Sequence, residues 1–515
     1  TNVFDVELVR SKEADHGDYS SNIALRISRD VKQTPVEIAK KLTDSLISLP
    51  YIEKLEVKEP GFVNFFIKED FWQDQVNEVL KLDKKFGSNE AGKGKKARVE
   101  FVSANPTGPL HFGNARGGPI GDALASVLEF SGYEVVREYY HNDVGVQVQK
   151  LGETIVNVQK GKNLEEQEYK GEYVFDLLKQ IQGQNSKVKR QNLTSEEAGK
   201  EAVKILLEEV IVDCKAIGIE FDEIYKESEL LESGKTKASI AKIDKFLKKK
   251  EGATWFAPSD DFLKDRETVI VKSDESYTYF ANDIAYHDIK FAEKPDLVID
   301  VFGANHHGHV PRLQAAINSL GYDQRKFHVI LYQWVRFFKG KILANMSKRA
   351  GTLLTLREVL EAVGKDAVRF LILMYDANTP INFDLDLARE KSTKNPVYYV
   401  QYAYARICSI LSKVEGLKTN ATDYGLLTTD FELDLIKQIT RLPELVEDIS
   451  RNFAVNQLTT YAIELADSFH SFYENCKVIS DDEELTSARI CLVEACRVTL
   501  YNTLWLLGVS APEKM

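Results

Sequence analysis

The sequence has 515 residues, of which 43% are hydrophobic and 28% charged, and its formal net charge at pH 7 is -12. At about 150 residues per domain this is an ordinary globular chain of roughly three domains, which excludes a collagen-like, low-complexity or largely disordered protein. The acidic total argues against indiscriminate binding to nucleic acid, because that affinity comes mainly from neutralised phosphates.

No run of about 18 apolar residues occurs, so the sequence predicts no transmembrane helix. The N-terminus is too acidic and polar for a signal peptide, and a cytosolic location is expected. The odd number of cysteines and the lack of a C-x-x-C pair fit neither a disulfide framework nor a zinc ribbon, so buried or inert thiols are predicted. They are Cys214, Cys408, Cys476, Cys491 and Cys496.

Residues 1–86 are expected to form a small α+β unit. Pro35–Leu49 carries an apolar stripe at helical spacing and starts with a proline, which favours the first turn of a helix. Val57–Ile67 contains Pro60-Gly61 and predicts a strand, a turn and a second strand. The Gly- and Lys-rich segment Gly87–Lys96 is interpreted as a linker.

Strands and helices alternate after this segment, which predicts an α/β domain over 97–391 with a Rossmann-type parallel sheet. The first βαβ unit comprises Arg98–Val102, Ile120–Phe130 and Val135–Tyr140, and the second comprises Leu297–Phe302, Pro311–Leu320 and Phe327–Tyr332. Between them, about 152–267, we expect a helical insertion. Residues 392–515 show only helical periodicity and predict an all-α bundle.

The segment Ser103–Gly118 (SANPTGPLHFGNARGG) lies between the first strand and its helix. A Gly-rich turn at the carboxyl end of a parallel strand exposes backbone N-H groups to anions, so a phosphate-bearing ligand is expected. It is neither a Walker loop nor G-x-G-x-x-G. Gly113 would let the backbone approach the ligand, with His111 and Asn114 directed at it. The alternative is a strand-to-helix turn whose histidine is bonded only locally.

A second segment, Leu343–Thr352 (LANMSKRAGT), carries the adjacent cations Lys348 and Arg349 before a helix. Flexible cations beside a glycine can fold over a polyphosphate and neutralise its charge. For an isolated Lys-Arg pair, a solvated basic loop is the simpler interpretation.

The two segments together resemble the signatures of class I aminoacyl-tRNA synthetases. His111-Phe112-Gly113-Asn114 resembles the HIGH motif, and Asn345-Met346-Ser347-Lys348-Arg349 resembles the KMSKS motif. The resemblance is narrower still, to arginyl-tRNA synthetase, and runs from about Gly17 to the end of the chain. The segments that carry it are SANPTGPLHFGNARGG, EYYHNDVG, YFANDIAYH, GANHHGH, MSKRAG and NPVYYVQYAYAR.

This chain departs from the two motifs at two positions. Asn114 replaces the second histidine of HIGH and can still donate and accept hydrogen bonds, but it carries no charge. Asn345 replaces the first lysine of KMSKS, which removes one cation and leaves Lys348 to stabilise pyrophosphate.

The resemblance implies an arginine-tRNA ligase that activates L-arginine with ATP and transfers it to the 2'-hydroxyl of the terminal adenosine of tRNA(Arg), with activation dependent on bound tRNA. Catalytic roles are implied for His111, Asn114 and Lys348. ATP binding is implied for His111, Gly113, Asn114, Gly303, His306, Met346 and Lys348. Arginine binding is implied for Ser103, Asn105, Asn142, Glu227, Tyr279 and Asp283.

Two carboxylates would select arginine, because a planar guanidinium pairs with carboxylates in a way that an ammonium group does not. Asp283 follows Tyr279 by four residues, so on a helix the two share a face. Glu227 occupies the place that the resemblance gives to a second guanidinium partner. Without the family, Asp283 is an ordinary carboxylate at a helix start and Glu227 a surface charge.

ATP is expected as a substrate with Mg2+ as its companion ion, and no metal site and no zinc are predicted. Positioning and charge stabilisation account for this kind of chemistry. The cluster His306, His307 and His309 indicates a metal site on composition alone, but its match to GANHHGH assigns it to the adenosine and arginine pocket.

Basic surface for tRNA is expected despite the acidic total. Gly234–Lys250 carries seven lysines around an apolar stripe and predicts an amphipathic helix with a cationic face, either for phosphate contacts or simply solvated. Four tyrosines, Tyr398, Tyr399, Tyr402 and Tyr404, could stack on anticodon bases or pack the bundle. The resemblance implies that the N-terminal unit contacts the tRNA elbow and the bundle the anticodon.

Two alternatives stay open at this point. Another class I synthetase, for example for cysteine, would call for a zinc-thiolate site, which the cysteine spacing disfavours. A non-catalytic RNA-binding paralogue would have lost the chemistry, whereas His111, Gly113 and Lys348 are all present. A monomer without membrane association is the expectation from the resemblance.

Overall fold

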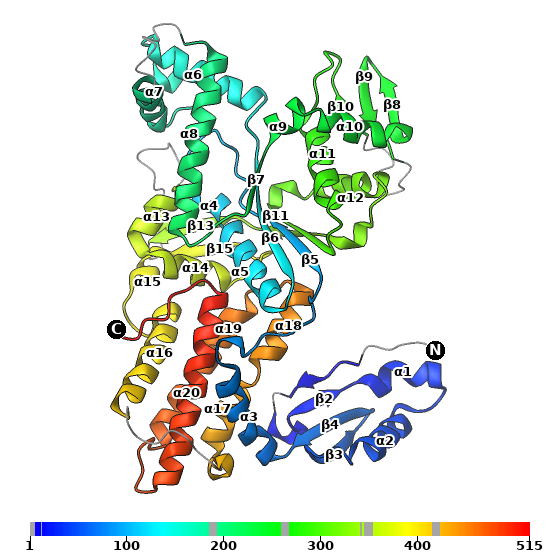
Figure 1. The fold of residues 1–515 in the computed structure, drawn as a ribbon, viewed down its shortest axis with the longest axis vertical. Coiled ribbons are helices and arrows are strands. Elements are labelled where there is room, and N and C mark those ends of the chain that lie inside the picture. Colours follow the sequence, from blue (N-terminus) through cyan, green and yellow to red (C-terminus); the bar gives the residue numbers. More distant parts are fainter. Residues whose placement is uncertain are drawn as a thin grey trace.

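The computed structural model describes residues 6–11, 13–184, 193–258, 267–339, 342–343, 354–414 and 423–515. A parallel sheet occupies the middle of the molecule, with two small subdomains beyond one end, a helical bundle beyond the other and the N-terminal unit beside the bundle (Figure 1). Met346 and Lys348 lie outside the described residues. None of the described helices is long and apolar enough to cross a membrane.

The N-terminal unit is an antiparallel sheet with two helices. Its strands, in the sheet order β1-β2-β4-β3, are β1 (Val9–Arg10), β2 (Tyr19–Ser21), β4 (Phe62–Ile67) and β3 (Ile52–Lys58). Helix α1 (Ile23–Val31) precedes α2 (Pro35–Leu46), which starts at a reciprocal capping box between Thr34 and Glu37. The predicted helix at Pro35 and the strand-turn-strand are therefore confirmed.

The next helix, α3 (Glu69–Leu82), leaves that unit and packs against the C-terminal bundle. Trp72 and Val76 are buried there. The segment that we interpreted as a linker is itself packed, because the Gly92 amide donates to the Ser131 carbonyl at 2.7 Å. The chain therefore enters the central sheet from the surface of the bundle.

The central sheet has the order β12-β11-β5-β6-β7, and every neighbouring pair is parallel, as predicted. Its strands are β5 (Lys96–Glu100), β6 (Glu134–His141), β7 (Glu223–Lys226), β11 (Leu297–Gly303) and β12 (Phe327–Tyr332). The helices α4 (Phe112–Ala115), α5 (Gly117–Phe130), α11 (Tyr279–Ala292) and α12 (Val310–Ser319) connect them. Helix α5 packs on β5, β6 and β11 and covers that face of the sheet. These strands are buried, so a ligand can reach them only at their ends.

The insertion consists of helices alone only in its first part, whereas its second part mixes helices and strands. This corrects the prediction of a helical insertion at about 152–267. That part consists of α6 (Val146–Gln159), α7 (Tyr173–Gln184) and α8 (Ser195–Ala216). The chain then forms β7 at the edge of the main sheet, α9 (Glu227–Glu232) and α10 (Lys235–Lys242). It ends in an antiparallel sheet of β8 (Leu247–Lys250), β9 (Ala253–Phe256) and β10 (Thr268–Val271).

The predicted amphipathic helix over Gly234–Lys250 is wrong in its second half, where β8 pairs with β9. Glu251 and Gly252, between the two strands, both have positive φ, 56° and 77°. Two consecutive residues at positive φ make the tight turn that matches the twist of a β-hairpin. The Glu-Gly pair therefore overrides the helical spacing of the residues before it.

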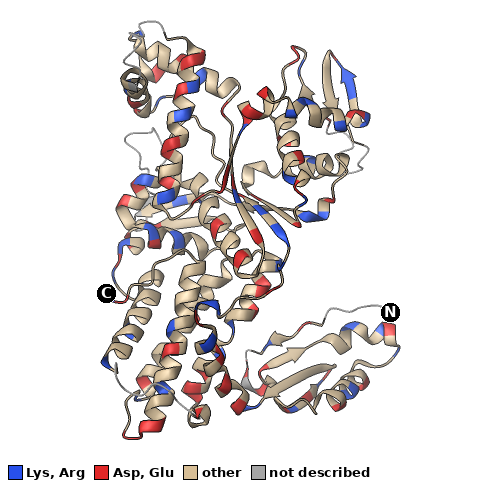
Figure 2. Ribbon diagram, viewed as in Figure 1, with Lys and Arg blue, Asp and Glu red and all other residues tan. Residues whose placement is uncertain are grey.

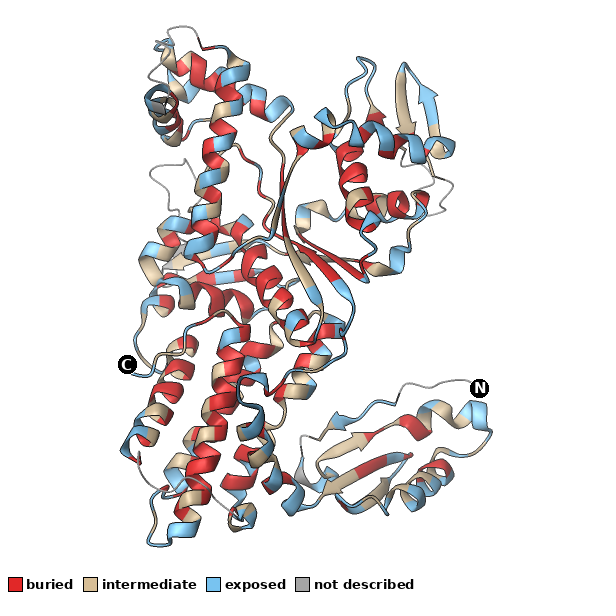
Figure 3. Ribbon diagram, in the orientation of Figure 1, coloured by how far each residue is buried: buried red, intermediate tan, exposed pale blue. Residues whose placement is uncertain are grey.

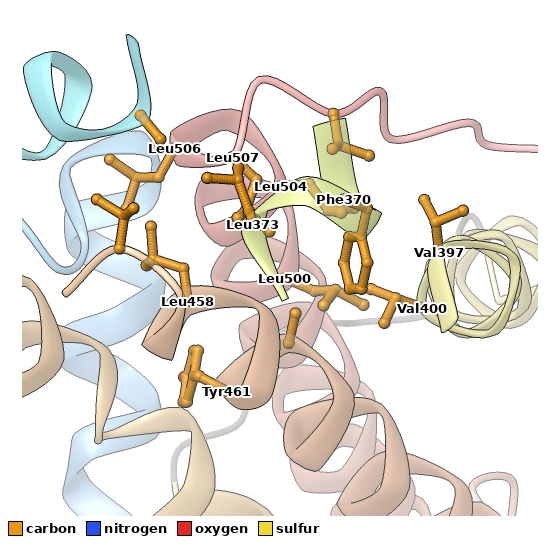
Figure 4. Close-up of a cluster of buried hydrophobic side chains, with 14 of the residues drawn as sticks. Phe370, Leu373, Val397, Val400, Leu458, Tyr461, Leu500, Leu504, Leu506 and Leu507 are labelled. Carbon is orange, nitrogen blue, oxygen red and sulfur yellow. The ribbon is translucent and has the colours of Figure 1, made fainter. Parts of the chain in front are cut away.

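The C-terminal bundle is all-α, as predicted. Its helices are α16 (Pro396–Lys413), α17 (Asp430–Ile439), α18 (Leu442–Asn452), α19 (Gln457–Asn475) and α20 (Glu483–Leu506). Leucine, valine and aromatic side chains from α14 (Lys365–Leu373), α16, α19 and α20 meet in one core (Figure 4). That core is continuous with the sheet, and Figure 3 shows burial running from the strands into the bundle.

The remaining elements join the sheet to the bundle. They are β13 (Val335–Lys339), β14 (Ile342–Leu343), β15 (Ile381–Asp384), α13 (Leu356–Val363) and α15 (Leu385–Arg389). All five cysteines lie in the described part of the chain and none forms a disulfide bond; all except the half-buried Cys408 are buried.

Candidate active site

A cavity of about 1160 Å³ opens where β5, β6 and β11 end. The predicted site residues that line it are Ser103, Asn105, Gly113, Asn114, Asn142, Glu227, Tyr279, Asp283, Gly303 and His306. They come from both βαβ halves and from the insertion. His111 is not in the lining, and Met346 and Lys348 lie outside the described residues. Ligands of parallel α/β sheets bind at this end of the strands.

The chain leaves β5 through two strained residues, Val102 (φ 70°) and Ser103 (φ 36°). Non-glycine residues in this region cost on the order of 1–3 kcal/mol each, and they are found where a structure must turn the chain sharply. The Ser103 hydroxyl donates to Glu100 at 2.9 Å and accepts from the Tyr140 amide at 3.0 Å. Ser103 therefore ties β5 to β6, and one of its lone pairs is left for a ligand.

The HFGN turn begins α4, with His111 as its N-cap residue. A Cβ atom on Gly113 would meet nothing within 4 Å, so a ligand can approach the backbone there. Burial lowers the pKa of His111, which keeps the imidazole neutral near pH 7. Its Nδ1 is buried without a hydrogen-bond partner among the described residues, and such an orphaned atom requires an explanation.

The chain that follows the Lys348-containing segment is attached to this same turn from Leu354 onward. The Phe112 amide donates to the Leu354 carbonyl at 3.0 Å, and the Leu356 amide donates to the Leu110 carbonyl at 2.8 Å. Thr355 then caps α13 through a reciprocal box with Glu358. Residues 354–356 are thus joined to the HFGN turn by backbone hydrogen bonds.

Glu227, the first residue of α9, forms one part of an acidic wall and is 4% exposed. It accepts a hydrogen bond from the Asn282 amide, which is itself held by the Thr236 hydroxyl at 3.0 Å. The second carboxyl oxygen of Glu227 has no partner in the described part of the chain. Burial, reinforced by the charge of Asp283, raises the pKa of Glu227 to about 8.

Asp283, on the first turns of α11, forms the other part of the wall. It is 5% exposed, and its Oδ2 lies 3.0 Å from His309 Nε2. Tyr279 precedes it by one turn, as predicted, and the charge of Asp283 holds the Tyr279 pKa well above its usual value. A carboxylate and a phenol thus share the cavity with a second, mostly protonated carboxyl group.

The sequence did not reveal Tyr140 and Asn282 as members of this wall. Tyr140 is buried with its hydroxyl unpartnered among the described residues, and burial raises its pKa well above the usual value. Asn282 and Asp283 are neighbours in the sequence, so no spacing pattern marked Asn282 as the group that orients Glu227. GANHHGH did point to His309, without giving its partner.

The histidine cluster is divided by the structure. His306 and His309 line the cavity, whereas His307 does not. Burial lowers the pKa of His306, so it stays neutral at pH 7. In the part of the chain that the structure describes, no group of three or more His, Cys, Asp or Glu side chains is arranged to hold a metal ion.

Comparisons with known proteins agree along the whole chain. Residues 1–67 match the family described as "Arginyl tRNA synthetase N terminal domain", residues 75–379 "tRNA synthetases class I (R), catalytic domain", and residues 400–515 "DALR anticodon binding domain". A curated arginine--tRNA ligase from Caldanaerobacter subterraneus subsp. tengcongensis is 41% identical, covering 99% of this chain and 94% of that protein.

Two solved structures have the same fold. A putative arginyl-tRNA synthetase from Campylobacter jejuni gives a TM-score of 0.78 at 29% identity, covering 87% of this chain and 100% of the other. The Thermus thermophilus arginyl-tRNA synthetase gives a TM-score of 0.81 at 22% identity, covering 99% of this chain and 96% of the other.

Proposed function

The chain belongs to the arginyl-tRNA synthetase family, and on this basis we propose which of its residues carry out the arginine-tRNA ligase reaction. ATP activates arginine as arginyl-adenylate, and the arginyl group passes to tRNA(Arg). The arginine-specific relatives leave no support for a cysteine enzyme or for a non-catalytic paralogue.

Glu227 and Asp283 bind the guanidinium of arginine. The single observation that carries this proposal is that both carboxyl groups reach one cavity from different elements. The free oxygen of Glu227 has no partner within the described residues, and Oδ2 of Asp283 has an ion-pair contact with His309 but no well-aligned hydrogen bond. Tyr279 lies against the same ligand, and Asn105, Asn142 and Ser103 surround its amino-acid end. A guanidinium carries five donors in a planar fork that matches carboxylate oxygens, whereas a lysine ammonium is a compact point charge without that geometry.

ATP lies over the HFGN turn. The open space at Gly113 and the orphaned Nδ1 of His111 support this, with Asn114, Gly303 and His306 at the same cavity edge. The arginine carboxylate attacks the α-phosphate in line and pyrophosphate leaves, so catalysis rests on positioning and charge. Mg2+ usually binds through the nucleotide phosphates and waters, and no step depends on a protein cage for it. The absence of bound zinc stays a prediction.

Lys348, with Met346 beside it, acts on the departing pyrophosphate. Lys348 lies seven positions before Thr355, whose neighbours are hydrogen-bonded to the HFGN turn. At roughly 3.6 Å per extended residue, that stretch spans at most about 25 Å, so the attachment at residues 354–356 limits how far Lys348 can lie from the HFGN turn.

tRNA contacts both ends of the molecule. We assign residues 1–86 to the tRNA elbow, 97–391 to catalysis and 392–515 to the anticodon. Tyr404 is buried in the bundle, whereas the half-buried rings of Tyr398 and Tyr402 lie parallel with centroids 6.5 Å apart. This favours Tyr398 and Tyr402 as the tyrosines that stack on bases. A monomeric, cytoplasmic enzyme remains the expectation from the family.

Steady-state aminoacylation of tRNA(Arg) tests the assignment of the acidic wall and of Lys348. Asp283→Asn is expected to raise the KM for arginine at least tenfold with the KM for ATP within twofold, because a charge-assisted bond contributes about 1.5–3 kcal/mol. Lys348→Ala is expected to lower kcat at least a hundredfold. An unchanged arginine KM in Asp283→Asn would contradict the assignment of Asp283 to the guanidinium. An unchanged kcat in Lys348→Ala would contradict the assignment of Lys348 to the pyrophosphate.

A further inference from the structure

Helix α11 presents a row of polar side chains to the interior, where a helix normally presents apolar ones. Asp283, His287 and Lys290 are spaced four and three residues apart, so they share one face. All three are buried, and His287 is only 2% exposed. Asp283 is the proposed arginine ligand among them, and although His287 also lines the cavity, the roles of His287 and Lys290 require a separate explanation.

Lys290 anchors the row to the central sheet. Its ammonium nitrogen donates to Glu100 on β5 at 2.6 Å and to Asp300 on β11 at 2.8 Å, and it lies 3.4 Å from Glu138 on β6. Asp300 and Glu100 are paired across the two strands. One oxygen of Asp300 is thus taken by Lys290, and the other remains for a second donor.

That second donor is His287, whose two ring nitrogens are both engaged. Nε2 lies 2.9 Å from Asp300 Oδ2, and Nδ1 lies 2.7 Å from the main-chain carbonyl oxygen of Asp283. A carbonyl can only accept, and so can an ionised carboxylate. Both ring nitrogens must therefore carry hydrogen, which makes His287 an imidazolium.

The electrostatic surroundings support the charged form. Burial alone would lower the His287 pKa, but the Asp300 carboxylate raises it above its usual value. Burial alone would raise the Asp300 pKa, but Lys290 and His287 hold it below its usual range. The groups that face the ring are Asp300 from β11, Lys290 and Tyr286 from α11, Glu100 from β5 and the edge of Phe327 from β12.

We propose that His287 is a positioning residue for arginine recognition: as a cation held by Asp300, it donates to the Asp283 carbonyl and fixes the helical turn that aims the Asp283 carboxylate into the cavity. The proposal rests on the assignment of Asp283 to the guanidinium. Although His287 lines the cavity, both of its ring nitrogens are engaged within the protein, so its effect on arginine passes through the backbone of Asp283.

A pair of substitutions separates the two hydrogen bonds of the ring. The amide nitrogen of asparagine falls where Nδ1 of histidine lies, and that of glutamine where Nε2 lies. His287→Asn therefore retains a donor toward the Asp283 carbonyl, whereas His287→Gln retains only the donor toward Asp300. We expect His287→Gln to raise the arginine KM about tenfold and His287→Asn to change it less than threefold.

Asp288 provides the matched control on the same helix. It is buried beside His287 but faces α10, where it accepts from Ser239 at 2.6 Å and from Lys242 at 2.7 Å. Asp288→Asn disturbs the packing of α11 to a similar degree without touching the Asp283 turn. We expect it to lower Tm and to leave the KM values for arginine and ATP within twofold of the unmodified protein.

The assay is aminoacylation by the full chain with tRNA(Arg), with KM measured for arginine and for ATP in each variant. A rise in the arginine KM confined to His287→Gln supports the proposal. An equal rise in Asp288→Asn, a rise shared by the ATP KM, or an unchanged arginine KM in His287→Gln overturns it. If the arginine KM is unchanged in both His287→Gln and Asp283→Asn, the assignment of Asp283 to the guanidinium is wrong. If Asp283→Asn raises the arginine KM and His287→Gln does not, only the proposed role of His287 is wrong.

Nitrogen NMR of the histidine-labelled protein gives a readout that does not depend on turnover. The signals of His287 are identified as those missing in His287→Asn. We expect both ring nitrogens to be protonated at pH 7.5 and to remain so when arginine is added. A neutral ring at that pH, with one nitrogen unprotonated, would contradict the cationic bridge even if the kinetic pattern were as expected.

Discussion

Glu227 is the residue of the acidic wall whose charge depends most on whether arginine occupies the cavity. Burial raises its pKa to about 8 from a reference value of 4.5, so in the ligand-free protein at pH 7 it is mostly protonated. The unfolded chain loses this proton near pH 4.5 and the folded chain only near pH 8. The free energy of unfolding of the ligand-free protein therefore falls as the pH rises through that window.

Arginine binding reverses this preference, because a guanidinium favours the carboxylate and binding expels the proton. We expect the arginine KM to fall as the pH rises from 6.5 to 8, by up to about tenfold per unit, and to level off above 8. Glu227→Gln should bind arginine more weakly at pH 8.5 and show little pH dependence between 6.5 and 8.5. The measurement is the arginine KM across that range. In Asp283→Asn the pH dependence should persist but shift to lower pH, because the charge of Asp283 helps to raise the Glu227 pKa.

The sequence located these residues to different degrees, for physical reasons. Tyr279 and Asp283 lie four apart in one helix, so their common face followed from the helix alone. Glu227 and Asp283 come from different elements, and only the family resemblance joined them. Asn282 and Tyr140 join the site through contacts between α11, α9 and β6, and residues brought together by tertiary packing leave no period in the sequence.

At the scale of elements, the predicted parallel sheet and bundle are confirmed because strong apolar periodicity and glycine stops at 132 and 321 marked their helices. The helix predicted for the lysine-rich segment Gly234–Lys250 is wrong in its second half because Ile240, Ile243 and Leu247 are spaced as in a helix although the helix ends at Lys242. In the structure Lys248, Lys249 and Lys250 occupy the edge strand β8 and form a blue strip on the smaller sheet (Figure 2). Charged edge strands resist pairing with other chains, and they also present ammonium groups to phosphates.

We expect this strand to contribute to tRNA binding. Replacing Lys248, Lys249 and Lys250 by glutamine should raise the tRNA KM several-fold near 150 mM salt and reduce the slope of log KM against log salt by roughly 0.7–0.9 for each phosphate that the lysines neutralise. The KM values for arginine and ATP should not change. The triple arginine variant is the matched control, because it keeps the charge; equal tRNA KM values for the glutamine and arginine variants would contradict the role.

At the scale of the whole molecule, Arg10 lies at the centre of a contact between the N-terminal unit and the bundle, which also includes the Asp18–Lys437 ion pair and a hydrogen bond from the Tyr19 hydroxyl to Glu444. The Arg10 guanidinium lies 5.2 Å from the centroid of the Tyr19 ring and 5.7 Å from that of the Trp72 ring. It donates through Nε to Glu444 at 2.8 Å and through Nη1 to the Lys437 carbonyl at 2.8 Å. If the two parts hold the elbow and the anticodon of one tRNA, this joint sets the distance between them.

Arg10→Ala is therefore expected to loosen the joint without affecting the cavity. The tRNA KM should rise a few-fold, with the arginine and ATP KM values unchanged, because a flexible N-terminal unit must be ordered each time tRNA binds. A double-mutant cycle with Glu444→Ala should give a coupling free energy of about 0.5–1 kcal/mol, since Glu444 is half exposed and solvent screens the pair. Arg10→Lys keeps the charge but loses the bidentate fork and most of the stacking, so its tRNA KM should be close to that of alanine. A native tRNA KM in Arg10→Lys would instead show that only the charge at position 10 matters. It would contradict the proposal that this joint sets the distance between the parts that hold the elbow and the anticodon.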